Sequence, residues 1–246
     1  MASTDLRATR AYYDEFSRNY ERERRPNDAY GYHALVDDLE VELTAKYGTD
    51  KAVLECGCGT GLILERIKEF AKVAKGIDLS PGMLELAKGR GLDVVEGSVT
   101  ELPFAQNTFD VTVSFKVLAH VPDIRGALRE MARVTKPGGV VLAEFYNPYS
   151  FRALAKRLGP AGNISAGTKE SAVFTRFDSP WAIQSLLPED LTLEGARGVR
   201  IVTPAAVAMR VPGLREVLRR LEWRLADGPA RVFGGFYVAI LRKRSI

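Results

Sequence analysis

The chain has 246 residues, of which 46% are hydrophobic and 27% charged, and its formal net charge is +4. This length suffices for one α/β domain with a buried core and a modest elaboration, and the composition is ordinary for a globular protein. Since no window reaches the roughly 18 uninterrupted apolar residues of a membrane-spanning helix, and the first residues lack a basic-then-apolar signal pattern, we expect a cytoplasmic protein.

Two helices are predicted before the first strand. They cover residues 6–20 and 28–46 and are joined near Pro26. Strands then alternate with helices over residues 51–146, which is typical of a mostly parallel sheet covered on both faces. Two later apolar runs, residues 191–202 and 233–241, predict the last two strands.

The glycine-rich turn at residues 53–61, Val-Leu-Glu-Cys-Gly-Cys-Gly-Thr-Gly, is the most informative stretch. An apolar run stops at Glu55, glycines follow at alternate positions, and helix formers begin at Leu62. Glycine tolerates a left-handed backbone and lets a ligand approach the main chain closely. The helix start then offers unpaired N–H groups and a positive dipole end. This pattern predicts a nucleotide-type binding loop.

The spacing of the glycines differs from that of two common nucleotide loops. The dinucleotide fingerprint is G-x-G-x-x-G, and the P-loop ends in Gly-Lys-Ser/Thr. Here Gly57, Gly59 and Gly61 alternate and Leu62 follows. The next apolar run ends at Asp78, an acid placed to accept hydrogen bonds from both ribose hydroxyls of an adenosine. A dinucleotide-dependent oxidoreductase is therefore disfavoured.

Glu55-x-Gly-x-Gly-x-Gly and Asp78 resemble the first two motifs of the class I S-adenosylmethionine-dependent methyltransferases. Residues 95–104, 109–123 and 128–139 resemble the later motifs of that family in the same order. The resemblance is closest to the type 11-like branch, which methylates small molecules, quinones and lipid-like acceptors. It implies a Rossmann-like three-layer α/β sandwich with a seven-stranded, mostly parallel sheet whose last strand is antiparallel.

The resemblance also implies one methyltransferase domain over residues 1–246, divided by role. Residues 1–47 would form an N-terminal helical lid and residues 48–146 the cofactor-binding core. Residues 147–190 and 203–230 would cover the acceptor side, with a basic helix expected at residues 151–158. Candidate acceptor contacts in this cover are the apolar Phe174, Phe177 and Trp181 and, for an anionic group, Arg152, Arg176 and Arg210.

The cofactor implied by the resemblance is S-adenosylmethionine. The expected contacts are Tyr13 and Tyr20 from the lid, Glu55, Gly57, Cys58 and Gly59 from the turn, Asp78, Leu79 and Met83 from the second strand and the following helix, and Ser98, Val99 and Phe115. Glu55 would orient the turn or bind the ammonium of the cofactor. Ser98 replaces the usual acid of the family, so it would hold the adenine without charge assistance. For the apolar contacts, core packing is the competing interpretation.

His120 and Tyr20 are the candidate catalytic residues. His120 follows the fourth strand, where acceptors bind in relatives, and a histidine of near-neutral pKa can remove a proton there. The alternative is that His120 holds the helix start at Asp123. Tyr20 would close over the methionine end, or merely pack with the other tyrosines of its helix. His33 is expected to be structural or substrate-lining.

No metal site is predicted, because Cys56 and Cys58 have no nearby histidine. We interpret them as small apolar residues that pack beside the glycine-rich turn. The expected partner is a small-molecule or lipid-like acceptor. An RNA or protein acceptor is the second interpretation, since arginines are dense after Arg197, but no aromatic-interleaved RNA-binding signature accompanies them. A non-catalytic cofactor-binding protein stays open as well, and so does the oligomeric state.

An amphipathic helix is predicted after residues 211–213, Val-Pro-Gly. Its apolar stripe consists of Leu214, Val217, Leu218, Leu221 and Leu225. Packing of this stripe onto the domain is the first interpretation, and a peripheral helix on a membrane surface is the second. The surrounding arginines are expected to pair with local acids.

Overall fold

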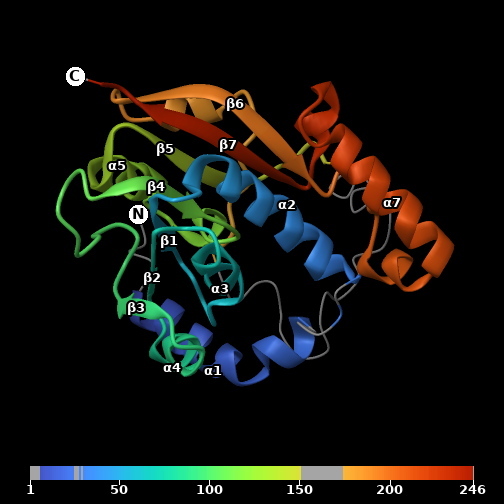
Figure 1. Ribbon diagram of the computed structural model, residues 1–246, viewed down its shortest axis with the longest axis horizontal. Helices are drawn as coiled ribbons and strands as arrows, with labels where there is room; N and C mark the ends of the chain where they lie inside the picture. The colour runs from blue at the N-terminus through green and yellow to red at the C-terminus, as the bar shows by residue number, and fades with distance from the viewer. Residues whose placement is uncertain (1–5, 25–27, 29, 151–173, 246) are drawn as a thin grey trace.

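A computed structural model describes residues 6–24, 28, 30–150 and 174–245 of the chain. Its centre is a seven-stranded sheet in the order β3-β2-β1-β4-β5-β7-β6 (Figure 1). The strands are β1 (Ala52–Cys56), β2 (Val73–Asp78), β3 (Asp93–Glu96), β4 (Phe109–Ser114), β5 (Thr135–Tyr146), β6 (Leu191–Val199) and β7 (Phe236–Lys243). β7 is antiparallel to both of its neighbours. The expected sheet, with its antiparallel last strand, is confirmed.

Helices cover the sheet at the places where the sequence pattern predicts them. They are α1 (Leu6–Arg24), α2 (Tyr32–Gly48), α3 (Leu62–Lys68), α4 (Pro81–Gly89), α5 (Ile124–Val134) and α7 (Pro212–Leu225), with short 3-10 turns η1 (Leu118–His120), η3 (Ile183–Leu186), η4 (Ala206–Arg210) and η5 (Pro229–Phe233). None of the helices in this part of the chain is long and apolar enough to cross a membrane. The basic helix expected at residues 151–158 and Arg152 lie outside the described residues.

Alternation along the strands creates a separate core on each face of the sheet. In β1, Val53 joins a cluster that contains residues of α2 and α3, whereas the adjacent Leu54 joins a cluster that contains residues of α5. Both residues are fully buried. Two apolar layers therefore sandwich the sheet, as an α/β fold with covered faces requires.

The two leading helices have different positions. α2 packs on one face of the sheet and buries Leu35, Leu39 and Leu43 almost completely. α1 lies beside α4 at the far edge, away from β6 and β7 (Figure 1). Of the two leading helices, α2 therefore belongs to the central sandwich and α1 lies outside it.

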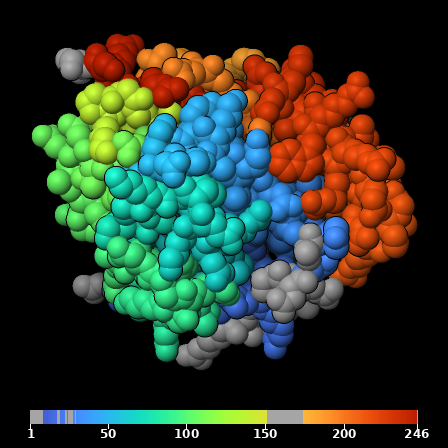
Figure 2. All heavy atoms as spheres, in the orientation of Figure 1, coloured from blue at the N-terminus to red at the C-terminus, as the bar shows by residue number. Residues whose placement is uncertain are grey.

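α7 forms a rim of the molecule (Figure 2), and a carboxylate anchors it. Glu222 is fully buried, and its Oε1 accepts hydrogen bonds from the Val202 and Thr203 amides at 2.9 and 2.8 Å. Its Oε2 accepts a third from the Ile201 amide at 2.8 Å. The helix is therefore fixed to the chain that leaves β6 mainly by polar contacts.

The expected packing of the α7 stripe is largely wrong. Leu218 is buried, but Leu214, Val217 and Leu221 are 44%, 50% and 39% exposed. The spacing correctly places these residues along one side of the helix. The rest of the domain covers only part of that side of the helix, so several residues of the stripe remain exposed.

Replacing Glu222 should cost much more stability than replacing an exposed acid of the same helix. Glu222→Leu leaves the three amides without their acceptor, which we expect to lower the free energy of unfolding by about 3 kcal/mol or more. The matched control Glu216→Leu, which loses only a surface pair with Arg215, should change it by less than about 0.5 kcal/mol. Urea unfolding measures both. Equal losses would contradict the anchoring role.

Candidate active site

The candidate site lies where the parallel strands β1, β2, β4 and β5 reach the same edge of the sheet. The glycine-rich turn follows β1, Asp78 ends β2, η1 with His120 follows β4, and Tyr146 ends β5. Ligands of open α/β sheets bind at the carboxyl ends of the strands. The fold therefore gathers the principal sequence-predicted residues at one edge.

The glycine-rich turn needs its glycines for two different reasons. Gly57 and Gly59 have φ values of 79° and 54°, which disfavour other residues. A Cβ atom at Gly57 would lie 2.2 Å from Cγ2 of Val117, so the turn packs directly on the segment after β4. A Cβ at Gly59 would meet no atom within 4 Å. The backbone at Gly59 therefore faces open space, where a ligand can approach it.

Asp78 connects the turn to the start of α4. Its Oδ2 accepts a hydrogen bond from the Gly59 amide at 2.8 Å, and its Oδ1 accepts one from the Ser80 amide at 2.9 Å. Burial raises the pKa of this carboxyl above its ordinary value, even though the Ser80 and Gly59 amides act in the opposite direction. Each oxygen keeps a second lone pair, so Asp78 can still accept hydrogen bonds from a ligand.

Glu55 is a buried acid with an unsatisfied oxygen. The residue is 3% exposed, and its Oε2 has no hydrogen-bond partner among the described residues. Burial raises the pKa of this carboxyl well above its ordinary value, and Lys116 only partly offsets this. An unpaired buried acceptor calls for a donor, and an ammonium group supplies one. Glu55, the open backbone at Gly59 and Asp78 therefore fit the amino-acid and ribose ends of S-adenosylmethionine.

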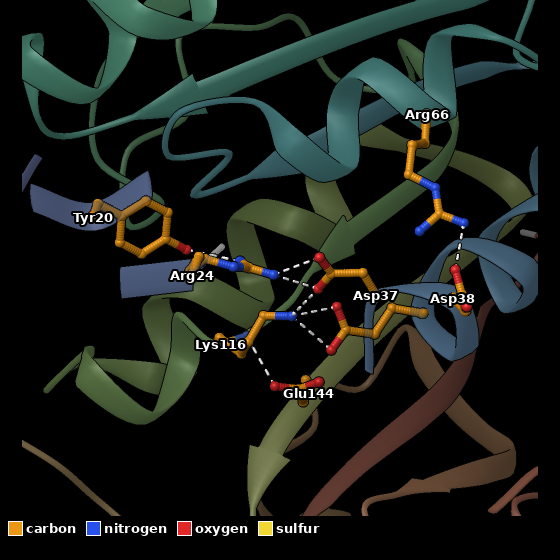
Figure 3. Close-up of polar contacts among 8 residues, drawn as sticks. Tyr20, Arg24, Asp37, Asp38, Arg66, Lys116 and Glu144 are labelled. Carbon is orange, nitrogen blue, oxygen red and sulfur yellow. Dashed lines mark hydrogen bonds and ion pairs between the residues drawn. The ribbon is translucent and has the colours of Figure 1, made fainter. Parts of the chain in front are cut away.

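A buried charge network lies beside this site (Figure 3). Nζ of Lys116 is 2.8 Å from Oε1 of Glu40 and 3.3 Å from Oδ1 of Asp37. The Lys116 amide donates to Oε1 of Glu144 at 2.9 Å. Burial alone would lower the pKa of Lys116, but the carboxylates of Glu40 and Asp37 raise it, so the lysine stays charged. Sequence reasoning missed this network, although a lone lysine within the apolar run 115–119 was a signal for it.

The same network reaches the N-terminal helix through Arg24. The guanidinium of Arg24 binds both oxygens of Asp37 and donates to the hydroxyl of Tyr20 at 2.8 Å. Asp37 in turn is held in its charged form: burial would raise its pKa, but Lys116 and Arg24 lower it. Tyr20, a candidate catalytic residue, thus has its hydroxyl bound to an arginine of its own helix.

α1 is attached to the cofactor edge by two further contacts. Oδ1 of Asp14 accepts hydrogen bonds from the Gly82 amide at 3.0 Å and from the Ser80 hydroxyl, at the first turn of α4. Glu21 forms an ion pair with Arg90, which also donates to the Thr60 carbonyl at 3.1 Å. Sequence reasoning did not assign Asp14 or Arg90 to the site. Both act across long separations in the chain.

Tyr13 is brought close to the cofactor residues. Its pKa is raised, first by burial and then by neighbouring groups that include Tyr12 and the carboxylate of Asp78. The phenol also contributes to the raised pKa of Tyr146. The Tyr13 phenol thus interacts electrostatically with Asp78 at the end of β2 and with Tyr146 at the end of β5, whereas the Tyr20 hydroxyl binds Arg24.

His120 has a defined tautomer. Its Nδ1 is 3.0 Å from the carbonyl oxygen of Phe174, which can only accept, so Nδ1 carries the proton. Nε2 then holds the lone pair and lies 3.5 Å from the hydroxyl of Tyr146. Burial lowers the pKa of the imidazole, with the Phe174 carbonyl opposing it. Since Asp123 caps α5 with its own side chain through the Gly126 amide at 2.9 Å, the helix start does not require His120.

Aromatic rings surround the His120–Tyr146 pair. The centroid of the Tyr146 ring lies 5.5 Å from that of His120, 6.1 Å from that of Phe177 and 5.2 Å from that of Phe236. Burial also raises the pKa of the Tyr146 phenol, so it is a hydrogen-bond donor at neutral pH. Tyr146 and Phe236 were not singled out from the sequence. These rings form an apolar wall beside a neutral imidazole.

The other residues expected to contact the adenine already make contacts within the protein. The Ser98 hydroxyl lies 2.7 Å from the Thr100 hydroxyl and accepts from the Thr100 amide at 3.2 Å. Val99 and Met83 are buried, and Leu79 is half-buried beside Asp78. Ser98 thus keeps only part of its hydrogen-bonding capacity for a ligand.

Two of the expected cofactor contacts pack in the core. Phe115 is 3% exposed and belongs to the cluster that contains residues of α2. Cys58 packs with Leu64 and Leu84. Burial raises the pKa of both thiols, Cys56 and Cys58, so they remain protonated, as small apolar residues do.

The cover residues are only partly available to an acceptor. Phe174, Phe177 and Trp181 are 42%, 58% and 66% exposed. Arg176 forms a two-pronged ion pair with Asp178, at 2.7 Å for each bond, so it is not free for an anionic group. His33 is half-buried, and its pKa is lowered to about 4, first by burial and then by Arg24. It is neutral and suits a structural role.

The sequence of this chain is similar to those of known methyltransferases. Residues 54–143 match the family described as a methyltransferase domain. The demethylmenaquinone methyltransferase of Mycolicibacterium paratuberculosis is 34% identical over 166 residues, which cover 62% of this chain and 70% of the relative. That of Mycobacterium marinum is 30% identical over 213 residues, 80% of this chain and 88% of the relative. For the enzyme of Paenarthrobacter aurescens, 42% identical, the match spans 44% of its length.

Solved structures share the fold at low identity. A methyltransferase from Thermotoga maritima superposes with a TM-score of 0.68 at 20% identity and covers 94% of this chain and 98% of its own. One from Mesorhizobium loti gives 0.58 at 18% identity, over 83% and 96%. Together with the sequence relatives, they identify the chain as a class I S-adenosylmethionine-dependent methyltransferase of the quinone-type branch.

Proposed function

We propose that this enzyme methylates a reduced, quinone-type acceptor with an apolar tail. The observation that supports the proposal is the neutral His120, whose unprotonated Nε2 lies 3.5 Å from the Tyr146 hydroxyl among aromatic rings. The relatives named as demethylmenaquinone methyltransferases support it. Flat rings suit a flat aromatic acceptor, and a neutral imidazole suits the removal of a hydroxyl proton.

We assign the cofactor contacts as follows. Glu55 binds the ammonium group, Asp78 the ribose hydroxyls, and the Gly59 backbone the chain between them. α1 acts as the lid, with Tyr13, which interacts electrostatically with Asp78, rather than Tyr20 as its cofactor-facing tyrosine. Its attachments through Asp14 and Glu21 support this assignment, because they hold the helix across the edge where the cofactor would bind.

Bound S-adenosylmethionine supplies a methyl group that its positive sulfonium already activates. The protein then has mainly to align the acceptor, which is worth roughly 7–11 kcal/mol. Nε2 of His120 would exchange its contact with Tyr146 for the acceptor hydroxyl and take that proton, which makes the adjacent ring carbon nucleophilic. Once that carbon carries the methyl group, its own proton would return to the oxygen, so His120 releases one net proton to solvent. Phe174 holds the imidazole in the required tautomer. Tyr146 donates a hydrogen bond rather than acting as a base, because its pKa is raised.

An RNA or protein acceptor has less support. Several arginines of the C-terminal third are neutralised within the chain: the buried Arg197 pairs with Asp227, Arg219 with Asp38, and Arg242 with Glu194. The sequence-based expectation that these arginines pair with local acids is met for them. The cytoplasmic location stays a prediction.

A direct assay tests the acceptor and the base together. A short-chain prenylated naphthohydroquinone should gain one methyl group from S-adenosylmethionine, detected by mass spectrometry. His120→Gln should lower turnover by about 100-fold or more with unchanged cofactor affinity, whereas the matched substitution His33→Gln should leave turnover nearly unchanged. Cofactor binding without transfer to this acceptor would contradict the quinone proposal. Full turnover of His120→Gln would exclude His120 as the base.

Glu55 predicts a pH dependence of cofactor binding. In the free enzyme its pKa lies well above the ordinary value, and a bound ammonium would lower it. Between the two pKa values the complex holds fewer protons than the free protein, so affinity rises with pH and binding releases a proton. Calorimetry in buffers of different ionisation enthalpy should detect this release in the wild type and lose it in Glu55→Gln. Identical proton release in both would assign the effect to another group.

A further inference from the structure

The exposed side of α7 carries a row of aliphatic side chains. We call it the apolar row; it consists of Leu214, Val217 and Leu221 of α7, which are 44%, 50% and 39% exposed, together with Val211 just before α7 and Val207 of the neighbouring η4, which are 54% and 62% exposed. Within α7 the members are three and four residues apart, so they share one side of the helix. Adjacent apolar side chains of this extent on a surface mark an interaction site more often than single exposed ones do.

Arginines border the apolar row. Arg220 and Arg224 each follow a row member by three residues, which places them beside it on the helix surface. Both are exposed, as is Arg210. None of the three forms an ion pair within the described part of the chain, unlike Arg215 and Arg219. Of the two acids of α7, Glu216 is exposed and paired with Arg215, and Glu222 points into the protein, where backbone amides bind it. The bordering charge is therefore positive.

The row lies near the acceptor side of the site. Arg215 of α7 stacks over the ring of Tyr30 at 5.1 Å, just before α2. Tyr32 follows Tyr30 by two residues, and its ring centroid lies 4.9 Å from Cζ of Arg200. Tyr32 is close enough to Tyr146 to contribute to its raised pKa. α7 is thus linked to the neighbourhood of Tyr146 through Tyr30 and Tyr32 at the start of α2, and it lies at the rim seen in Figure 2.

We propose that the apolar row docks on an anionic lipid surface. Aliphatic side chains flanked by arginines match the acyl and headgroup layers of such a membrane. A helix at a rim presents a protruding surface, which a flat bilayer can meet. The inference rests on the proposed function in one respect: an acceptor with an apolar tail resides in the bilayer, so docking there brings it to the site.

Vesicle co-sedimentation tests the docking. The full chain should bind phosphatidylglycerol–phosphatidylcholine vesicles and bind pure phosphatidylcholine vesicles much more weakly. The triple variant Leu214→Ser/Val217→Ser/Leu221→Ser and the double variant Arg220→Gln/Arg224→Gln should each reduce binding by about tenfold or more. The matched controls are Leu86→Ser on α4, where Leu86 is 39% exposed, and Arg125→Gln/Arg129→Gln on α5. They should bind as the wild type does.

Several outcomes would overturn the docking. These are absence of wild-type binding, equal binding by row and control variants, or sedimentation velocity showing a dimer that only the row variants dissociate. The last result would assign the row to a second copy of the chain. Activity distinguishes this proposal from the previous one: row variants should lose turnover on a vesicle-embedded naphthohydroquinone but keep it on a soluble, tail-less one. Vesicle binding without any methyl transfer would contradict the acceptor proposal while still supporting the docking.

Discussion

The carboxylate of Asp78 holds the cofactor edge of this enzyme together. One oxygen accepts from the amide of Gly59 and the other from that of Ser80, so the glycine-rich turn and the start of α4 share a single buried group. The turn in turn packs on the segment after β4 through Gly57 and Val117. The positions of the ligand-facing backbone, of α4 and of the strand ends are therefore coupled.

Charge balance is the second constraint on the site. Two cations, Lys116 and Arg24, face the carboxyl groups of Asp37, Glu40 and Glu144, and Glu55 lies nearby. Burial raises the pKa of Glu40, Glu55 and Glu144, so ionising all of these acids at once is costly. A site with an excess of buried acids favours a cationic ligand. S-adenosylmethionine, with its ammonium and sulfonium groups, has that character.

Local patterns made most of the fold predictable. The alternation of apolar runs and helical segments, the glycine spacing and the acid at the end of β2 are encoded over a few residues each, and the structure confirms the sheet they imply. Long-range contacts were not predictable. Asp14 reaches the first turn of α4, and Lys116 reaches Asp37 and Glu40, over separations of 66 to 79 residues. Periodicity placed Leu214, Val217 and Leu221 together but could not tell whether anything covers them.

The most direct measurement is a calorimetric titration of wild type and Asp78→Asn with S-adenosylmethionine. We expect micromolar binding that weakens about ten- to a hundredfold in the variant, since a hydrogen bond to a charged acceptor is worth about 1.5–3 kcal/mol. Asp93→Asn, which alters an exposed acid paired with Lys75 on the neighbouring strand, should bind like the wild type. Unchanged affinity in a folded Asp78→Asn protein would contradict the account of this site.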